Sequence, residues 1–359
     1  MALINQLDKY HLCYLVVNDI ADDHFAGLSH VAEHTLLIPS DIGLDFSGRG
    51  YTCANHVWLC FVSEKLETVV EVDRQIYSGK IFTQETVNRA RCQVEEEIIR
   101  LQEHTAQSKK LIRFVTENRV EKFAMGEVDQ INKIQVADIR SWFEERKQRG
   151  QIYRFIFRDA HKMIVSTQVQ NCAMYTDKKF YDCVTCDGED QFLFLTPLNK
   201  ARLIQLFFRI PMIDSKESMI RKAIFEFCIQ LKVQNAIGMD VEIVDKFFDG
   251  DERFSVLKFP WYDMPRFVEI IRKVRQEIDG ISANEFYAYR EKFKYYAAAV
   301  IVREKSNAEI MNAIKNDILY AIPNIQLEDL QYIEQVKYEM FPREMITKSS
   351  LKVVIIYKR

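Results

Sequence analysis

The chain has 359 residues, enough for two ordinary domains, and 48% of them are hydrophobic and 28% charged, as in a typical globular protein. Its net charge of −3 provides neither the basic surface of a nucleic-acid-binding protein nor a long acidic tail. No run of about 18 apolar residues occurs, which excludes a membrane-spanning helix. Residues 1–9 lack the basic flank and apolar run of a secretory signal, so we expect a cytoplasmic protein.

The eight cysteines are consistent with a reducing compartment, in which we expect each to be a single buried residue. Cys183 and Cys186 form one Cys-x-x-Cys pair. A structural zinc site would need two further ligands, and only Cys172 is near in the sequence, so we interpret the pair as incidental.

The first half of the chain shows both strand and helix patterns. Runs rich in β-branched and aromatic residues predict strands, and apolar residues spaced three and four apart predict helices. The expected strands are residues 11–17, 51–62 and 151–158, and the expected helices are residues 27–37, 65–78 and 83–101. Thr83 is a favourable N-cap for the last helix, whose pattern can continue to about residue 123.

The pattern weakens between residues 159 and 198, and a similar order of elements then recurs. Strands are expected over residues 201–210, 240–248, 253–260 and 351–357, and helices over residues 215–237 and 264–278 and within 284–340. This recurrence predicts an α+β fold of two homologous domains, each a mainly antiparallel sheet packed with helices. The expected domains are residues 1–165 and 199–359, connected by residues 166–198.

The residues with the clearest chemistry are His30, Glu33 and His34, in the sequence His-Val-Ala-Glu-His. Residues three and four apart share a helix face, so both imidazoles can be directed at one metal ion while Glu33 lies beside them. Zinc binds such nitrogen ligands, and a catalytic zinc keeps one position for a water that a carboxylate can deprotonate. His-x-x-Glu-His is the inverzincin signature. The alternative is a coincidental pair of helix histidines.

A third zinc ligand is needed, and the run Glu95, Glu96 and Glu97 offers one. Adjacent helix residues point about 100° apart, so one carboxylate can face inward while the others remain in solvent. Glu97 borders the apolar stripe of the helix and is the preferred ligand, with Glu95 next and Glu96 last. The alternative interpretation of the run is a solvated acidic face.

The segment from Gly27 to His34 resembles the Gly-Leu-x-His-x-x-Glu-His stretch of the pitrilysin/insulinase family of zinc metallopeptidases, which includes the mitochondrial processing peptidases. Tyr51 and Thr52, and the segment that ends at Glu97, are also similar to family segments. The resemblance implies zinc bound by His30, His34 and Glu97, with Glu33 as catalytic base. It also implies one half of a clamshell that encloses a peptide-sized chamber.

The chain departs from the family pattern in several places. Arg49 and Gly50 occupy the places of a usual Asn-Ala pair, and the spacing from the motif to the third ligand is shorter than usual. Family members that complete their own sites carry an Arg and a Tyr after the long helix of the second domain, where this chain has Lys232 and Met239. Lysine lacks the guanidinium fork, and methionine cannot donate a hydrogen bond to an oxyanion. We therefore expect a heterodimer in which a homologous partner subunit supplies the Arg and Tyr.

The resemblance predicts a zinc-dependent endopeptidase subunit that hydrolyses peptides and, in particular, removes a leader segment from a precursor peptide. General degradation of oligopeptides is an alternative substrate class. A subunit that retains the fold but only binds or assembles is a second alternative, and a structural zinc site with His56 as fourth ligand is a third. Substrate-binding residues are not identified by the sequence.

Overall fold

A computed structural model describes residues 9–37, 46–117, 123–158, 163–168, 190–195, 202–208, 215–248, 252–263, 266–302, 325–342 and 351–356, with a few single residues between 303 and 350. The chain forms two compact units. Unit 1 consists of residues 1–109 and 119–178, and unit 2 of residues 110–118 and 179–359. Cys172, Cys183 and Cys186 lie outside the described residues.

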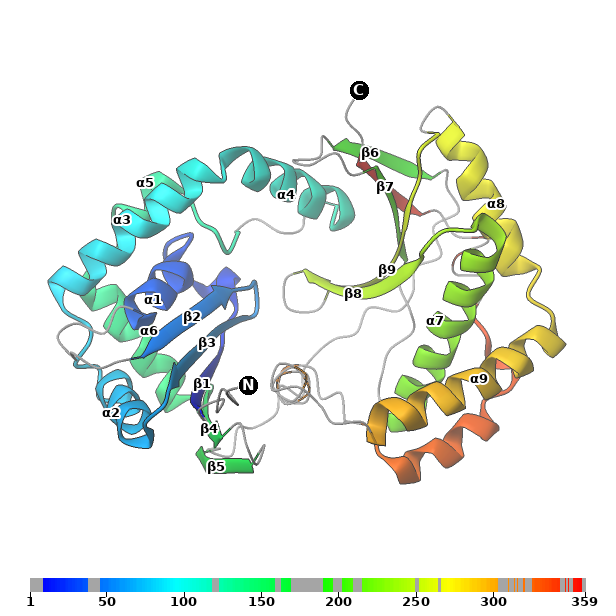
Figure 1. Ribbon diagram of the computed structural model, residues 1–359. Coiled ribbons are helices and arrows are strands. Elements are labelled where there is room, and N and C mark those ends of the chain that lie inside the picture. Colours follow the sequence, from blue (N-terminus) through cyan, green and yellow to red (C-terminus); the bar gives the residue numbers. More distant parts are fainter. Residues whose placement is uncertain are drawn as a thin grey trace, which may run out of the picture. The chain divides into compact units, whose positions relative to one another are not determined.

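Unit 1 contains a five-stranded antiparallel sheet with the strand order β2-β3-β1-β4-β5 (Figure 1). Its strands are β1 (Tyr10–Val17), β2 (Ser47–Thr52), β3 (His56–Ser63), β4 (Ile152–Arg158) and β5 (Met163–Gln168). β1 lies in the middle, and β2 is an edge strand.

The helices of unit 1 are α1 (Leu28–Leu37), α2 (Leu66–Tyr77), α3 (Gln84–Arg100), α4 (Gln102–Val115), α5 (Val128–Ile131) and α6 (Val136–Gln148). α1 packs on β2 and β3 and against α3 and α6. Apolar residues from alternate positions of β1 meet apolar residues of the helices in one core, which includes Leu12, Tyr14, Val31 and Val94. The end of α4 is grouped with unit 2, because Val115 packs there with Phe207.

The edge strand β2 has two different faces. One face is turned toward α1. The Thr52 side chain lies on this face, and a Cβ atom on Gly48 would meet Leu37 of α1, while one on Gly50 would meet Glu33. Ser47, Arg49 and Tyr51 alternate with them and lie on the other face of the sheet.

The backbone of β2 also alternates between its two sides. The Cys53 N–H donates to the His56 carbonyl, so these two residues form a hydrogen-bonded pair in the ladder with β3. Alternate pairs along an antiparallel ladder are not hydrogen-bonded. The N–H and C=O groups of Gly48, Gly50 and Thr52 therefore point away from β3, toward the open edge of the sheet.

Unit 2 contains a second five-stranded sheet with the order β6-β10-β7-β9-β8. Its strands are β6 (Gln191–Leu195), β7 (Leu203–Phe208), β8 (Glu242–Phe248), β9 (Glu252–Pro260) and β10 (Lys352–Ile356). All neighbours pair antiparallel except β6 and β10, which are parallel. The expected α+β class with sheets packed by helices is therefore confirmed.

The helices of unit 2 are α7 (Lys216–Ile237), α8 (Phe267–Asp279) and α9 (Ala283–Val302), followed by the short 3-10 helices η3 (Leu327–Gln335) and η4 (Tyr338–Met340). α7 packs against α8 and α9, and its apolar side joins the sheet in one core that includes Ile224, Cys228, Leu257 and Phe286. Gly238 ends α7 with φ of 66°, a left-handed conformation that glycine adopts readily.

Several predicted elements differ from the structure. The single strand expected over residues 51–62 is a hairpin of β2 and β3, and the stretch without a clear pattern contains β5 and β6. α6 was not predicted, although Ile139, Trp142 and Phe143 are buried at helical spacing. The N-cap at Thr83 is confirmed, and Thr83 forms a capping box with Thr86. Among the described residues, no helix is both long and apolar enough to cross a bilayer.

Candidate metal centre

The motif helix α1 places His30, Glu33 and His34 where α1 meets α3 and β2. The chain enters the helix through Gly27, whose φ of 91° is left-handed. A Cβ atom on Gly27 would lie 2.9 Å from the Cα atom of Gly126, so both the conformation and the close contact favour glycine there.

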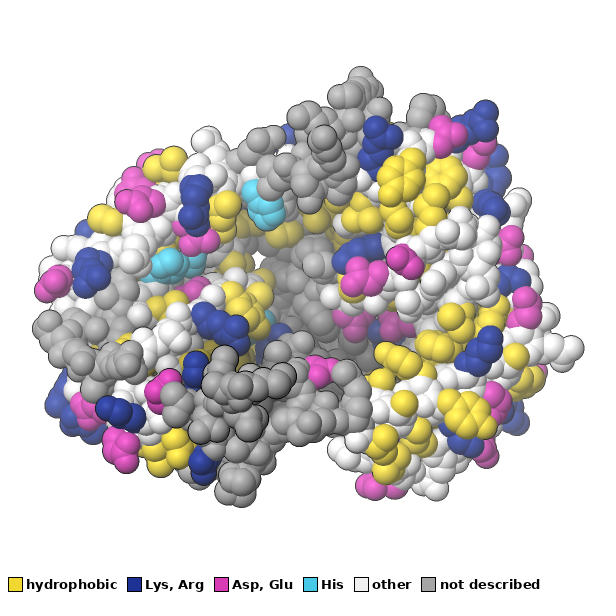
Figure 2. All heavy atoms as spheres, in the orientation of Figure 1, with side chains coloured by type: hydrophobic (Ala, Val, Ile, Leu, Met, Phe, Trp, Pro, Cys, Tyr) yellow, Lys and Arg dark blue, Asp and Glu magenta, His cyan; other side chains and the backbone are white. Residues whose placement is uncertain are grey.

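The side chains of His30, His34 and Glu97 converge, and one ligand atom from each lies within 4.8 Å of the others. Glu97 Oε2 is 3.5 Å from His30 Nε2 and 3.4 Å from His34 Nε2. His30 is buried, whereas His34 and Glu97 are partly exposed. Figure 2 shows histidine and acidic side chains adjoining at the surface over α1 and α3.

The outer nitrogen of each imidazole has its own partner. His30 Nδ1 lies 3.3 Å from the Met125 carbonyl oxygen, and His34 Nδ1 lies 3.2 Å from Gln93 Oε1. Both partners can accept a hydrogen bond, so these contacts favour the tautomer with the proton on Nδ1, in which Nε2 of a neutral ring presents a lone pair. With both rings neutral, three electron-pair donors would face one another, and a cation between them would stabilise this arrangement; a protonated imidazole would instead pair with Glu97.

The donor set fits zinc. Tetrahedral zinc bonds of about 2.0–2.1 Å place neighbouring ligand atoms about 3.3 Å apart. The separations of 3.4 and 3.5 Å between Glu97 Oε2 and the two Nε2 atoms are close to that value. Two imidazoles and one carboxylate are also the ligands of several catalytic zinc sites, which keep a fourth position for water.

Only one member of the acidic run reaches the two histidines. Glu97 joins the group of ligand atoms, whereas Glu95 and Glu96 do not. Val94, three residues before Glu97, is fully buried and fixes the phase of α3, so Glu96 is exposed and Glu97 is turned toward α1. His56, on β3, is also outside the group, and its Nδ1 lies 2.8 Å from Asn55 Oδ1.

Glu33 is a buried carboxyl group with only 4% of its surface exposed. The Thr52 hydroxyl donates to Glu33 Oε2 over 2.6 Å, and Gly50 leaves room for Oε1, which a Cβ atom there would approach to 2.9 Å. Burial raises the pKa of Glu33 to about 7, although the Thr52 hydrogen bond opposes the rise. Burial disfavours the charged form of His30 as well and so lowers its pKa, and the neighbouring His34 lowers this pKa further. A carboxyl group with a pKa near neutrality is suited to exchange protons with water.

A buried polar network holds the start of α1. Asp23 Oδ2 accepts the backbone N–H of Ser29 over 3.1 Å, and Asp23 Oδ1 accepts Arg146 Nη2 over 3.2 Å. The Arg146 guanidinium also donates to Asn18 Oδ1 and lies over the Trp142 ring. Burial raises the pKa of Asp23, and the Ser29 and Arg146 contacts oppose the rise.

Sequence reasoning did not identify these supporting residues. Asp23 lies five residues before the motif helix begins at Leu28, outside its first turn, so its role was not marked by a local helix signal. Gln93, Met125 and Arg146 support the site from other elements, and no sequence pattern marks them. Thr52 lies in a segment that resembles the family, but sequence reasoning assigned it no role.

The thiols of unit 1 differ from the expectation of single buried cysteines. Cys13 and Cys60 are opposite each other on β1 and β3, with their sulfur atoms 3.4 Å apart, and Cys92 is exposed.

In unit 2, Lys232 and Met239 lie near the end of α7 and just after it. Lys232 Nζ donates to Glu285 Oε1 over 2.6 Å and lies 3.8 Å from Glu277 Oε2. The ammonium group of Lys232 is therefore paired with carboxylates of its own unit.

Comparisons with known proteins find similar folds but no similar sequence. No family model and no curated protein matches the chain. The first half of the periplasmic protease PqqL from Escherichia coli is similar with a TM-score of 0.72 and 12% identity, over 98% of this chain and 87% of that chain. The match to whole PqqL, with a TM-score of 0.72 and 11% identity, covers 98% of this chain and 45% of PqqL, so the chain spans about half of that protein.

Two further similar structures represent an M16-like peptidase and an inactive relative. The M16-like peptidase of Alicyclobacillus acidocaldarius has a TM-score of 0.62 at 11% identity, over 97% of this chain and 93% of that chain. The M16 inactive domain from Pseudomonas fluorescens has a TM-score of 0.59 at 10% identity, over 99% and 93%. This chain therefore has the fold of an M16, or pitrilysin-type, peptidase half.

Proposed function

We propose that this chain is the zinc-carrying half of a metalloendopeptidase. His30, His34 and Glu97 bind the metal, and Glu33 is the catalytic base. The observation that carries the proposal is the convergence of three electron-pair donors beside a buried carboxyl group. The M16 fold supports it, because peptidases with this fold are among the similar structures.

A zinc ion bound here would lower the pKa of a water to about 7 and polarise a peptide carbonyl. Glu33 accepts the proton of the attacking water and returns it to the leaving amine. The Thr52 hydroxyl holds Oε2 of Glu33 and leaves Oε1 for the proton transfer. Met125 and Gln93 fix the imidazole tautomers through the Nδ1 atoms.

The open edge of β2 suits an extended peptide. Gly48, Gly50 and Thr52 direct their backbone N–H and C=O groups toward this edge, and the described residues include no strand paired there. A peptide added to the edge gains main-chain hydrogen bonds beside Glu33, which contacts both Gly50 and Thr52. The peptide bond to be cleaved therefore lies next to the carboxyl group that serves as base.

A homologous partner subunit completes the enzyme in this proposal. Lys232 is engaged with Glu285, and Met239 has no hydrogen-bond donor on its side chain, so neither residue offers the oxyanion contact of an Arg and Tyr pair. The coverage of about half of PqqL is consistent with one half of a two-part protease. We expect little peptidase activity from the chain alone and full activity with its partner.

The test is the pair of variants Glu33→Gln and Glu96→Gln, each with the partner subunit. Glu33→Gln removes the base while preserving shape, so we expect zinc to remain bound and turnover to be lost. Glu96→Gln removes a carboxylate of the exposed acidic run and is expected to leave both unchanged. An active Glu33→Gln enzyme would eliminate the assignment of the base.

A non-catalytic binding or assembly role is the second candidate, because one similar structure is an M16 inactive domain. Zinc content separates the two: about one zinc ion per chain favours the enzyme, and a metal-free chain favours the binding role. Within the enzyme proposal, we favour removal of a leader segment from a precursor over general degradation of oligopeptides. Cleavage at one site in a precursor encoded by a neighbouring gene, with unrelated peptides left intact, would support this choice.

A further inference from the structure

The face of β2 opposite α1 carries a positive charge close to the candidate metal centre. Ser47, Arg49 and Tyr51 lie on this face, and all three are exposed. Among the residues that the structure describes, no hydrogen bond or ion pair is found for Arg49. It neighbours Gly50, where a Cβ atom would lie 2.9 Å from Glu33 Oε1. The guanidinium group is exposed on an edge strand, where a ligand can reach it.

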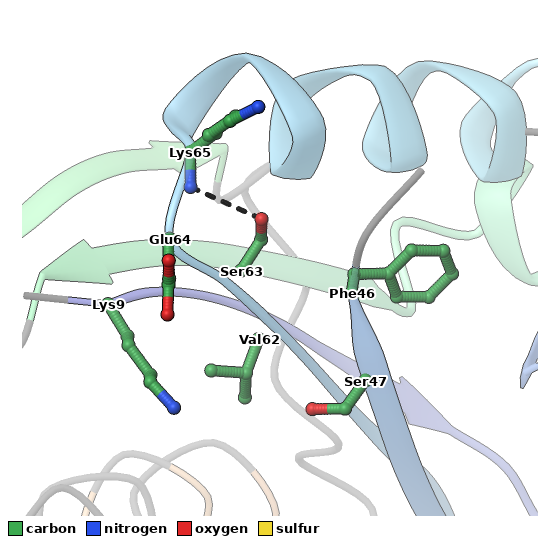
Figure 3. A pocket seen from close by; sticks show the side chains of 7 residues that line it. All are labelled: Lys9, Phe46, Ser47, Val62, Ser63, Glu64 and Lys65. Atoms are coloured by element: carbon green, nitrogen blue, oxygen red, sulfur yellow. Dashed lines mark hydrogen bonds between the residues drawn. The ribbon is translucent and has the colours of Figure 1, made fainter. Parts of the chain in front are cut away.

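A second positive charge, that of Lys9, lies just before β1, across β3 from the beginning of β2. A recess of about 220 Å³ is formed there between β2, the end of β3 and the residue before β1, and its lining includes Lys9, Ser47 and Glu64 (Figure 3). The Lys9 and Ser47 side chains extend to the same side as Val62, whereas the Lys65 side chain extends to the other side, along α2. Within the described part of the chain, Lys9 forms no ion pair, and its neighbour Glu64 in the recess forms none with it.

The spacing of these charges matches an extended chain. Ser47 and Arg49 are two residues apart on one face, about 6.6 Å along the strand. A peptide paired antiparallel with β2 hydrogen-bonds to Gly48 and Gly50, so its residues opposite Ser47 and Arg49 occupy non-hydrogen-bonded positions, where side chains approach most closely. On this face of the sheet, one side chain of the peptide therefore lies opposite Arg49, and the side chain two residues further on lies opposite Ser47, beside the recess lined by Lys9.

We propose that the substrate is an acidic peptide in which two acidic side chains, separated by one residue, bind Arg49 and Lys9 along β2. This inference rests on the proposed function. The first acidic residue lies opposite Arg49, next to the Glu33 site. The second follows it on the C-terminal side and enters the recess beside Ser47, because the peptide runs antiparallel to β2.

Glu64 and Lys65 allow an effect of individual side chains on peptide binding to be distinguished from an effect of overall charge. Glu64 lines the same recess, so its carboxylate opposes the second acidic residue. Lys65 carries the same charge as Lys9 and also lines the recess, but its ammonium group is directed away. Removal of these charges should therefore have different effects on binding.

Binding is measured by fluorescence anisotropy on full-length chain with the Glu33→Gln substitution, so that no peptide is cleaved. The probes are two labelled peptides of about ten residues, long enough to span β2, that differ only as Glu-x-Glu and Gln-x-Gln. Both are acetylated and amidated, which removes the terminal charges. Because two exposed ion pairs each contribute modestly, we expect the acidic peptide to bind about threefold to tenfold more tightly in low salt.

Four variants test the positions. Arg49→Gln and Lys9→Gln should each reduce the preference for the acidic peptide, Glu64→Gln should increase it, and Lys65→Gln should leave it unchanged. Equal affinity for the two peptides would overturn the proposal, and so would a Lys65→Gln effect as large as that of Lys9→Gln, which would indicate an effect of net charge alone. Zinc content and hydrolysis are measured separately: loss of both would refute the proposed function, whereas hydrolysis without a charge preference would refute only this inference.

Discussion

The Thr52 hydroxyl tests how the fold positions the proposed base. Thr52→Val replaces the hydroxyl by a methyl group of similar size and removes the 2.6 Å hydrogen bond to Glu33 Oε2. A hydrogen bond to a charged group contributes about 1.5–3 kcal/mol, and each 1.4 kcal/mol corresponds to about a tenfold change in rate. If the bond holds Glu33 in its reactive orientation, kcat should fall about tenfold to a hundredfold.

The assay is the hydrolysis of a fluorogenic peptide by the chain together with its partner subunit, with kcat, KM and zinc content measured for each variant. Zinc content should be unchanged, because Thr52 is not in the group of ligand atoms. Thr52→Ser retains the hydroxyl and should restore most of the rate. Thr52→Val with the kcat of the parent enzyme would refute the positioning argument.

Three further substitutions test the supporting structure. Gln93→Leu removes the hydrogen-bond partner of His34 Nδ1 and should weaken zinc binding about tenfold. This is the lower end of the range for losing a partner of a metal-binding histidine, because Gln93 is exposed. Competition with a chelating dye measures the zinc affinity. Gly50→Ala places a Cβ atom 2.8 Å from Leu59 Cδ2 and should cost about 1–3 kcal/mol in urea unfolding. Arg146→Met leaves Asp23 buried without its cation and should cost about 3–5 kcal/mol in the same assay.

Gln93→Leu and Arg146→Met each have a matched control within the chain. Gln102→Leu changes an exposed glutamine without a described hydrogen bond and should not alter zinc affinity; an equal loss in both variants would contradict the role of Gln93. Arg149→Met removes an exposed arginine whose ion pair in the described part of the chain is with exposed Glu145, and it should change stability by less than about 1 kcal/mol. Equal destabilisation by the two arginine variants would contradict the buried network. Gly50→Ala with unchanged stability would contradict the close packing on Glu33.

The part of the site that follows from local helix geometry was predictable from the sequence. His30, Glu33 and His34 are fixed relative to one another by helix geometry, so their spacing alone placed them on one side of α1. Glu97 was preferred over its neighbours from the phase of the apolar stripe on α3, and the structure brings it to the two histidines. Both inferences need only the period of a helix.

The rest of the site depends on how distant segments meet. Thr52 reaches Glu33 only through the register of β2, and Arg146 reaches Asp23 across more than a hundred residues of sequence. The hairpin between β2 and β3 was missed because its turn, Cys53 to Asn55, contains neither glycine nor proline. α6 did carry a signal, since its buried residues have helical spacing.

Zinc content is the most direct test of the central claim, that two imidazoles and one carboxylate bind a catalytic metal. Purified chain, Glu97→Gln and Glu96→Gln are compared by elemental analysis after dialysis against metal-free buffer. We expect about one zinc ion per chain in the parent and in Glu96→Gln, and a large loss in Glu97→Gln. A parent chain without zinc, or equal zinc in both variants, would contradict it.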